Sequence, residues 1–229
     1  MSPGSGAGLW DRRFRLSTHF FTASDAPGSD PSHDREGVVP RKGTKPRGRG
    51  ARAVFFDRDG TLMEEVHYCG DPAKVRVFPG VPEALRKLKQ AGLRTFIVTN
   101  QSGLGRGLIT EAQYCAVQEE LLRQIGAGLI DATYFCADPP SVPSTRRKPE
   151  PGMVWEAAAA YDIDLARSYF IGDKSADIQC GRRAGTRTIL VLTGYPAEPD
   201  SHPDFTADDM TQAVQIVLSP HFTNPRDAD

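Results

Sequence analysis

The sequence predicts an α/β protein: a Rossmann-like central parallel sheet with helices on both faces, in three layers and with no cap domain. Two observations predict this fold. From residue 53 onward, short apolar runs alternate with longer segments whose apolar residues recur every three or four positions, the spacing of one helix face. The apolar runs are continuous, which is typical of parallel strands buried on both faces. No long insertion interrupts the pattern, so we expect no separate cap.

The first two predicted strands enclose one helix. Residues 53–56, Ala-Val-Phe-Phe, form a short buried strand. The Pro-Gly-Val-Pro segment at 79–82 introduces a helix, because proline is favoured in the first helical turn, and Gly92 is a natural stop at its end. Residues 95–98 form the second strand.

The rest of the chain continues this alternation. Thr110 and Gln113 make a capping-box signal for a helix that runs to about residue 125. The remaining expected elements are, in order, a strand at 132–135, an Ala-rich helix at 152–161, a strand at 169–171, a helix at 175–184 and a strand at 188–192. The alternation of strands and helices predicts parallel strand pairing throughout.

The 229 residues divide into three regions. Residues 1–52 are rich in Gly, Pro, Ser and Arg, and they hold ten basic against five acidic residues. Since this segment has too few apolar residues to offset the entropy of ordering, we expect a disordered basic leader, with a nucleic-acid-binding tail or a targeting peptide as alternatives. Residues 53–218 form the globular domain, and 219–229 are expected to be a flexible tail.

Composition excludes several classes of protein. With 39% hydrophobic and 25% charged residues, the chain suits one soluble domain, and no apolar run approaches the length of a membrane span. A net charge of -1 argues against a nucleic-acid binder. The four cysteines are too far apart for a C-x-x-C metal pair or a dense disulfide framework, which indicates reduced thiols in a cytoplasmic protein. We expect a monomer.

Charged and polar residues follow four of the predicted strands. In an open parallel sheet, ligands bind outside the carboxyl ends of the strands, so these residues are expected to line one crevice. They are Asp57 and Asp59 after the first strand, Thr99, Asn100, Gln101 and Ser102 after the second, Arg147 and Lys148 in the loop after the third, and Asp173, Lys174 and Asp177 after the fourth.

Asp57 and Asp59 are the most informative of these residues. Two carboxylates so close repel each other, and one of them tends to hold a proton unless a cation intervenes. Phosphoryl transfer uses both outcomes, with Mg²⁺ held against Asp57 and a proton on Asp59 for the leaving oxygen. The alternative is a plain strand end followed by a solvated turn.

These segments together resemble the motifs of the haloacid dehalogenase-like (HAD) hydrolases. The resemblance covers roughly residues 53–196 and includes Asp57-Arg-Asp-Gly-Thr, Val98-Thr-Asn-Gln-Ser-Gly, Arg147-Lys-Pro and Gly172-Asp-Lys. In detail the chain is similar to the small heptose-bisphosphate and histidinol-phosphate phosphatases. Ser102 stands where the histidinol-phosphate enzymes typically show an aspartate, so the D-glycero-D-manno-heptose 1,7-bisphosphate 7-phosphatases are resembled most.

The chemistry expected of the two aspartates agrees with this resemblance. Asp57 attacks phosphorus and becomes an aspartyl-phosphate. Asp59 protonates the departing sugar oxygen and then takes a proton from the hydrolytic water. Asp57 and Asp173, with the main-chain carbonyl of Asp59, are expected to bind Mg²⁺ through oxygen.

Other residues are expected to hold the substrate. Thr99 and the amide of Asn100 grip the phosphoryl group, and Lys148 neutralises the nucleophile and the transferring charge. The resemblance implies that further residues touch the rest of the substrate, namely Gln101, Ser102, Arg147, Lys174, Glu65 and Tyr68. For Asp177, a helix-capping role and a metal contact both remain open.

The loop after the third strand departs from the family pattern. The resemblance implies a structural zinc held by Cys-x-His-Pro and by Cys-x-Cys before Arg-Lys-Pro. This chain has Cys136-Ala-Asp-Pro and Ser144-Thr-Arg at those places. Since one thiolate cannot hold zinc, we predict that no structural zinc is bound.

The function expected is therefore a Mg²⁺-dependent phosphomonoesterase. Its substrate is a small phosphosugar, in first place D-glycero-D-manno-heptose 1,7-bisphosphate, which it converts to the 1-phosphate. The alternatives are a histidinol-phosphate phosphatase, a polynucleotide 3′-phosphatase and a non-catalytic interaction protein.

Overall fold

Six parallel strands form one sheet in the order β3-β2-β1-β4-β5-β6. The computed structural model describes residues 50–195 and 201–219. The strands are β1 (Ala53–Phe56), β2 (Arg94–Asn100), β3 (Ala132–Cys136), β4 (Tyr169–Gly172), β5 (Arg187–Val191) and β6 (Phe205–Ala207). The predicted parallel α/β sheet is confirmed.

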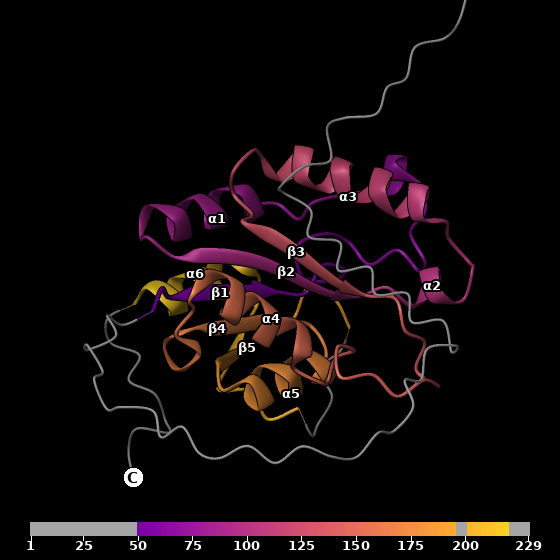
Figure 1. The fold of residues 1–229 in the computed structure, drawn as a ribbon. Coiled ribbons are helices and arrows are strands. Elements are labelled where there is room, and N and C mark those ends of the chain that lie inside the picture. Colours follow the sequence, from indigo (N-terminus) through magenta and orange to yellow (C-terminus); the bar gives the residue numbers. More distant parts are fainter. Residues whose placement is uncertain (1–49, 196–200, 220–229) are drawn as a thin grey trace, which may run out of the picture.

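Helices cover both faces of this sheet, which confirms the three layers (Figure 1). The helices are α1 (Val81–Gln90), α2 (Ser102–Gly105), α3 (Glu111–Ile125), α4 (Gly152–Tyr161), α5 (Ser175–Ala184) and α6 (Met210–Leu218), with short 3-10 turns η1 (Pro72–Lys74) and η2 (Leu165–Arg167). One core layer holds residues of α1, α3 and α6, and the other holds residues of α4 and α5. No cap domain interrupts the described residues.

The strand period of two divides the core between the faces. In β1, Val54 and Phe56 pack on the side of α1, α3 and α6, whereas Phe55 packs on the side of α4 and α5. The Phe55 ring stacks on Phe96 of β2 and Phe170 of β4, with centroid distances of 5.3 and 6.4 Å. Burying each such side chain contributes about 1.5–3 kcal/mol. Both faces of β1 are therefore apolar, as its continuous apolar run predicts.

The local signals that predicted the starts of two helices are present in the structure. The Oγ1 of Thr110 accepts a hydrogen bond from the Gln113 amide at 3.2 Å, and the Gln113 side chain accepts one from the Thr110 amide at 2.8 Å. This reciprocal capping box starts α3 where the sequence predicts. At α1, Gly80 takes a φ of 83° directly before the first helical residue, a conformation that favours glycine.

The last strand and helix are absent from the sequence prediction. Strand β6 has three residues, too few for a recognisable period, and it exists because its backbone pairs with β5. Helix α6 then packs on α1. Strand β2 also extends past the predicted residue 98, so Thr99 and Asn100 are its last two residues.

The folded region begins slightly before the predicted boundary. The Ala51 amide donates to the Asp162 carbonyl at 2.8 Å, and the Asp164 amide donates to the Ala51 carbonyl at 2.9 Å. Ala51, which we assigned to the leader, thus pairs with the turn after α4, and the Arg52 carbonyl accepts from the Arg94 amide at 2.9 Å. The rest of the predicted leader and the tail after Ser219 lie outside the described residues.

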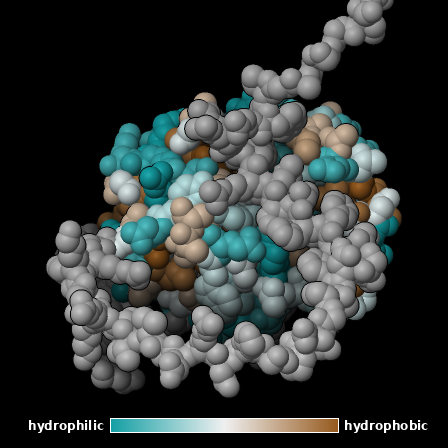
Figure 2. Space-filling model, in the orientation of Figure 1, coloured by the Kyte–Doolittle hydropathy of each residue, from teal (hydrophilic) through white to brown (hydrophobic). Residues whose placement is uncertain are grey.

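Helices of the described ranges are too short or too polar to cross a bilayer. In the view of Figure 2, hydrophilic and hydrophobic residues alternate over the uncovered surface instead of forming one continuous apolar face.

The strand order places a crevice at the end of β1. The chain passes from β1 to β2 and β3 on one side and then crosses back to β4, β5 and β6 on the other. In sheets of this kind, ligands bind at the carboxyl edge where the strand order reverses. The expected site therefore lies around the carboxyl ends of β1, β2 and β4.

Gly181 provides a test of the packing that holds α5 against the sheet. A Cβ at this position would lie 2.6 Å from the Phe170 Cβ and 2.7 Å from a Thr188 methyl. We expect Gly181→Ala to destabilise the protein by roughly 1–3 kcal/mol, although alanine is the better helix former. Chemical denaturation measures this, with Gln179→Ala on the exposed face of α5 as the control. A gain of stability in Gly181→Ala would contradict the close packing.

Candidate active site

The carboxyl ends of β1, β2 and β4 open onto a cleft of about 320 Å³. Its walls hold nearly all of the residues that the sequence singled out: Asp57, Asp59, Glu65, Tyr68, Thr99, Asn100, Gln101, Ser102, Arg147, Lys148, Lys174 and Asp177. Asp173 is buried directly behind the wall, next to Asp57 and Asp177. The predicted site residues are thus brought together at one edge of the sheet.

Lys148 is the centre of the ion pairs at the floor of the cleft. Its Nζ lies 2.6 Å from the Asp57 Oδ1 and 2.7 Å from the Asp177 Oδ1, and it donates to the Val98 carbonyl at 2.8 Å. Burial by itself lowers the pKa of Lys148, but the charges of Asp177 and Asp57 raise the pKa above its ordinary value. The side chain is therefore a cation at neutral pH, held against the predicted nucleophile.

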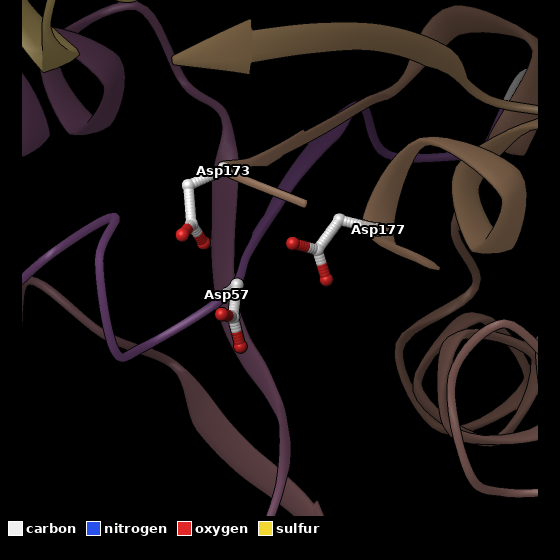
Figure 3. Close-up of side chains that lie close together, drawn as sticks. All are labelled: Asp57, Asp173 and Asp177. Atoms are coloured by element: carbon white, nitrogen blue, oxygen red, sulfur yellow. The ribbon is translucent and has the colours of Figure 1, made fainter. Parts of the chain in front are cut away.

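Three carboxylates converge at this place, as Figure 3 shows, and two of them, Asp57 and Asp177, pair with Lys148. Asp57 follows β1, Asp173 follows β4 and Asp177 lies in the first turn of α5. Each offers an oxygen within 4.8 Å of the others, and all three side chains are buried. Burial and the charges of Asp57 and Asp177 raise the pKa of Asp173 to about 7. Burial also raises the pKa of Asp177, to about 6, while Lys148 opposes this shift.

This group of carboxylates fits a magnesium ion. Mg²⁺ prefers oxygen ligands from one or two carboxylates together with waters and phosphate oxygens. A cation among the three side chains would relieve the repulsion between their charges. For Asp177 the structure shows the helix-capping contact, in which its Oδ2 accepts the Lys174 amide at 3.1 Å, and its carboxylate also lies in this group, so a metal contact stays a prediction.

Gly60 explains why a glycine follows the two aspartates of the motif. It adopts a φ of 84°, and a Cβ there would lie 2.4 Å from the Asp173 Oδ2. A side chain at this position would thus be strained and would also displace the carboxylate. The turn after β1 can pack against the end of β4 only with glycine here.

Asp59 lies apart from the three carboxylates. Arg58 donates to it from Nε at 3.0 Å and from Nη2 at 3.1 Å, and the Gln101 Nε2 donates to its Oδ2 at 2.9 Å. The repulsion expected between Asp57 and Asp59 is therefore met by two separate cations, Lys148 for the first and Arg58 for the second. Sequence reasoning did not assign Arg58 a role, because its burial is invisible in the sequence.

Asn100 connects the end of β2 to the lysine loop. Its Nδ2 donates to the Lys148 carbonyl and its Oδ1 accepts from the Lys148 amide, each at 3.0 Å. Next to it, the Thr99 Oγ1 accepts from the Gln101 side chain at 2.9 Å. The side chains of Asn100 and Gln101 are thus engaged within the protein, which leaves the Asn100 main chain as its predicted contact to phosphate.

Cations and aromatic rings surround the mouth of the cleft. Lys174 pairs with Glu65 at 2.9 Å, and its Nζ lies 4.4 Å from the centroid of the Tyr195 ring. On another wall, Arg147 donates to the Asp138 carbonyl at 2.9 Å. Tyr195 is another lining residue that the sequence did not indicate, because it belongs to none of the motifs quoted for the resemblance.

Tyr68 is held in place at the mouth by Arg106. The arginine donates to the Tyr68 hydroxyl at 2.5 Å, and its guanidinium lies 5.5 Å from the ring centroid. Tyr68 itself has a φ of 49°. Ser102 begins α2 on the same side and also lines the cleft.

The loop after β3 is closed by hydrogen bonds. The Ser144 Oγ accepts from the amides of Arg146 and Arg147, each at 3.2 Å, and the Cys136 thiol donates to Asp138 at 3.3 Å. Burial raises the pKa of the Cys136 thiol, so the thiolate that would bind a metal is disfavoured. The absence of a structural zinc stays a prediction.

Two protein-family models match the chain. A haloacid dehalogenase-like hydrolase model matches residues 54–121, and a HAD-hydrolase-like model matches residues 145–213. The matched segments contain Asp57, Asp59 and Thr99 in the first case and Lys148 and Asp173 in the second.

Relatives in sequence are phosphatases. The chain is 37% identical over 188 residues to the D-glycero-D-manno-heptose-1,7-bisphosphate 7-phosphatase of Thermosynechococcus vestitus, a match that covers 73% of this chain and 95% of the other. It is 38% identical over 159 residues to the D-glycero-beta-D-manno-heptose-1,7-bisphosphate 7-phosphatase of Escherichia coli K12, covering 65% and 83%.

Solved structures agree with these relatives. The D,D-heptose 1,7-bisphosphate phosphatase of B. bronchiseptica, solved with magnesium and phosphate, superposes with a TM-score of 0.66 at 30% identity, over 73% of this chain and 98% of that one. The corresponding enzyme of Burkholderia thailandensis superposes with a TM-score of 0.55 at 28% identity, over 73% and 99%.

The raised pKa of Asp173 predicts how the stability of the metal-free protein depends on pH. Between the ordinary pKa of an aspartate and about 7, the folded protein holds a proton that the unfolded chain has released. The contribution of this group to stability therefore falls as pH rises through that window. We expect Asp173→Asn, which cannot ionise, to stabilise the metal-free protein more at pH 8 than at pH 5.

Thermal unfolding with a chelator at both pH values measures this difference. Added Mg²⁺ should stabilise the unsubstituted protein at pH 8 and Asp173→Asn much less. An equal effect of the substitution at pH 5 and pH 8 would contradict the assignment of the buried proton.

Proposed function

The chain belongs to the haloacid dehalogenase-like hydrolases, and from that premise we propose that it is a Mg²⁺-dependent phosphatase that converts D-glycero-D-manno-heptose 1,7-bisphosphate to the 1-phosphate. The observation that carries the proposal is the position of Asp57, 2.6 Å from the Lys148 Nζ and within a group of three buried carboxylates. Relatives at 37–38% identity are named for this substrate.

Asp57 is the proposed nucleophile. Its carboxylate faces the cleft at the end of β1, and the ammonium of Lys148 holds its orientation. An oxygen of Asp57 bonds to phosphorus while the ester P–O bond breaks, which leaves an aspartyl-phosphate. The positive charge of Lys148 also compensates the charge on the transferring phosphoryl group.

Asp59 is the proposed acid and base. It gives its proton to the departing sugar oxygen in the first step and takes a proton from the attacking water in the second. Thr99 and the amide of Asn100, which follow it along the cleft wall, bind the phosphoryl oxygens.

Asp57, Asp173 and the main-chain carbonyl of Asp59 would hold the magnesium ion, and Asp177 is close enough to join them. When bound, Mg²⁺ supplies positive charge that stabilises the phosphoryl oxygens. Burial, and after it the charges of neighbouring carboxylates, raise the pKa values of Asp173 and Asp177, and a bound cation would favour their charged forms.

The mouth of the cleft is proposed to hold the rest of a small phosphosugar. Arg147 and Lys174 offer positive charge that suits its second phosphate. Glu65, Ser102 and Tyr68 offer hydrogen-bonding groups to sugar hydroxyls. Gln101 also lines the cleft, but its side-chain amide is engaged with Arg58, Asp59 and Thr99. The four cysteines are free, which suits our further proposal that the protein acts as a monomer in the cytoplasm.

Removing the nucleophile tests the mechanism. Asp57→Asn is nearly equal in shape and should reduce turnover by on the order of 10⁴ or more, because the uncharged amide oxygen of asparagine is a poor nucleophile. Phosphate release measures the activity and thermal unfolding confirms the fold. Glu83→Gln, on the exposed side of α1, is the control and should leave turnover unchanged. Undiminished activity of Asp57→Asn would contradict the proposed role of Asp57 as the nucleophile.

A panel of phosphate esters tests the substrate. We expect kcat/KM for heptose 1,7-bisphosphate to exceed that for histidinol phosphate, a 3′-phosphorylated oligonucleotide and p-nitrophenyl phosphate by about 100-fold or more. Similar values for the heptose and the aryl ester would refute the sugar assignment while leaving the phosphatase chemistry in place.

A further inference from the structure

Arg58 is a charged side chain that the proposed chemistry does not use. It lies between the two motif aspartates in sequence, and only 1% of it is exposed. Removing a guanidinium from water costs several kcal/mol unless its charge and hydrogen bonds are met inside the protein. The contacts of Arg58 therefore indicate what this burial serves.

The polar contacts of Arg58 are directed at Asp59 and Gln101. Nε and Nη2 donate to the two oxygens of Asp59 at 3.0 and 3.1 Å, and Nη2 also donates to the Gln101 Oε1 at 3.0 Å. The guanidinium carbon lies 5.6 Å from the centroid of the Tyr114 ring, which supports it from α3. Nη1 has no hydrogen-bond partner among the described residues. The Arg58 side chain thus donates to both oxygens of one carboxylate.

Gln101 completes this arrangement. Its Oε1 accepts from Arg58, so its amide nitrogen must point the other way, where it donates to the Asp59 Oδ2 and the Thr99 Oγ1, each at 2.9 Å. Through Gln101, Asp59 is thereby connected to Thr99, which is proposed to bind the phosphoryl group. No water or solvent contact is needed to orient the amide.

The two oxygens of Asp59 are consequently not equivalent. Oδ2 accepts from the Arg58 Nε and the Gln101 Nε2, whereas Oδ1 accepts from the Arg58 Nη2 alone. Oδ1 keeps a lone pair that can carry a proton, and 13% of the side chain is exposed toward the cleft. Three hydrogen bonds fix the plane of the carboxyl group before any substrate arrives.

We propose that Arg58 and Gln101 are positioning residues that hold the Asp59 carboxyl group so that its Oδ1 delivers the proton to the leaving sugar oxygen. This inference rests on the proposed function. An oxygen of Asp57 bonds to phosphorus, and the electron pair of the broken ester bond stays on the sugar oxygen. That oxygen takes the proton from Asp59 Oδ1. The water that later attacks the aspartyl-phosphate returns a proton to Asp59.

The dependence of the rate on the leaving group distinguishes positioning from a merely structural role. A sugar alkoxide needs a proton in order to leave, whereas p-nitrophenolate leaves readily without one. A loss of Asp59 alignment should therefore slow phosphorylation of Asp57 by a sugar phosphate far more than by p-nitrophenyl phosphate. A general loosening of the site would slow both substrates alike.

The experiment follows single-turnover phosphorylation of the full-length, Mg²⁺-loaded enzyme by heptose 1,7-bisphosphate and by p-nitrophenyl phosphate. Asp59→Asn sets the reference. Its phosphorylation rate should fall roughly 10²–10⁴-fold with the sugar phosphate and less than about tenfold with the aryl phosphate. The rate of phosphorylation by the sugar phosphate should fall about 10–100-fold in each of three variants, Arg58→Met, Arg58→Lys and Gln101→Met, which is a loss no larger than that of Asp59→Asn. The rate with the aryl phosphate should not fall.

Tyr114→Phe is the matched control. It keeps the ring beneath Arg58 and removes a buried hydroxyl that has no hydrogen-bond partner among the described residues, so both rates should stay unchanged. Circular dichroism shows which variants fold. If Arg58→Met does not fold, the comparison is made on Arg58→Lys and Gln101→Met, which retain more of the buried contacts.

Equal losses with the two substrates in the Arg58 and Gln101 variants, with Asp59→Asn still selective, would overturn the positioning role and leave the proposed function intact. Equal losses in Asp59→Asn as well would remove Asp59 as the acid and overturn the inference with it. The proposed function fails separately if Asp57→Asn still forms a phosphorylated enzyme.

Discussion

The site depends on the buried ammonium of Lys148. Its bonds to Asp57, Asp177 and the Val98 carbonyl join the end of β1, strand β2, helix α5 and the loop before α4. Each of these charges would be costly alone in a buried position, so each requires the others. Two carboxylates pair with this lysine and Asp173 lies beside them, and the remaining negative charge is what makes the same place suitable for a divalent cation.

A second ion pair keeps the two motif aspartates separate. Asp57 is paired with Lys148, and Asp59 is paired with Arg58 and Gln101. Two carboxyl groups one residue apart can thus have different surroundings and different tasks. Asp57, the proposed nucleophile, lies among carboxylates that suit a metal ion, whereas Asp59, the proposed acid and base, lies against the Arg58 guanidinium at the cleft wall. This division agrees with the general rule that acid–base assignments follow from the environments of paired titratable groups.

Local sequence signals predicted the parts of the fold whose physical cause is local. The buried strand of residues 53–56 and the capping box at Thr110 depend on neighbours within a few residues, and both lie where expected. Strand β6 has only three residues and forms by pairing with β5, so nothing local marks it. The extension of β2 to Asn100 likewise follows from pairing with β3, which continues to Cys136.

The sequence by itself determined the family, the carboxyl edge of the sheet as the site, and the residues that gather there. Only the tertiary structure decided which of them are partners. Asn100 holds the main chain of Lys148 from 48 positions away, and Lys148 reaches Asp57 across 91 positions. The contacts of Arg58 with Asp59 and Gln101, and those of Asp177 with Lys148 and the Lys174 amide, are likewise visible only in the tertiary structure. The reason is physical: residue types and spacing indicate which groups meet at a strand edge, but hydrogen bonds and ion pairs are set by distances of a few ångströms, which depend on how distant segments pack.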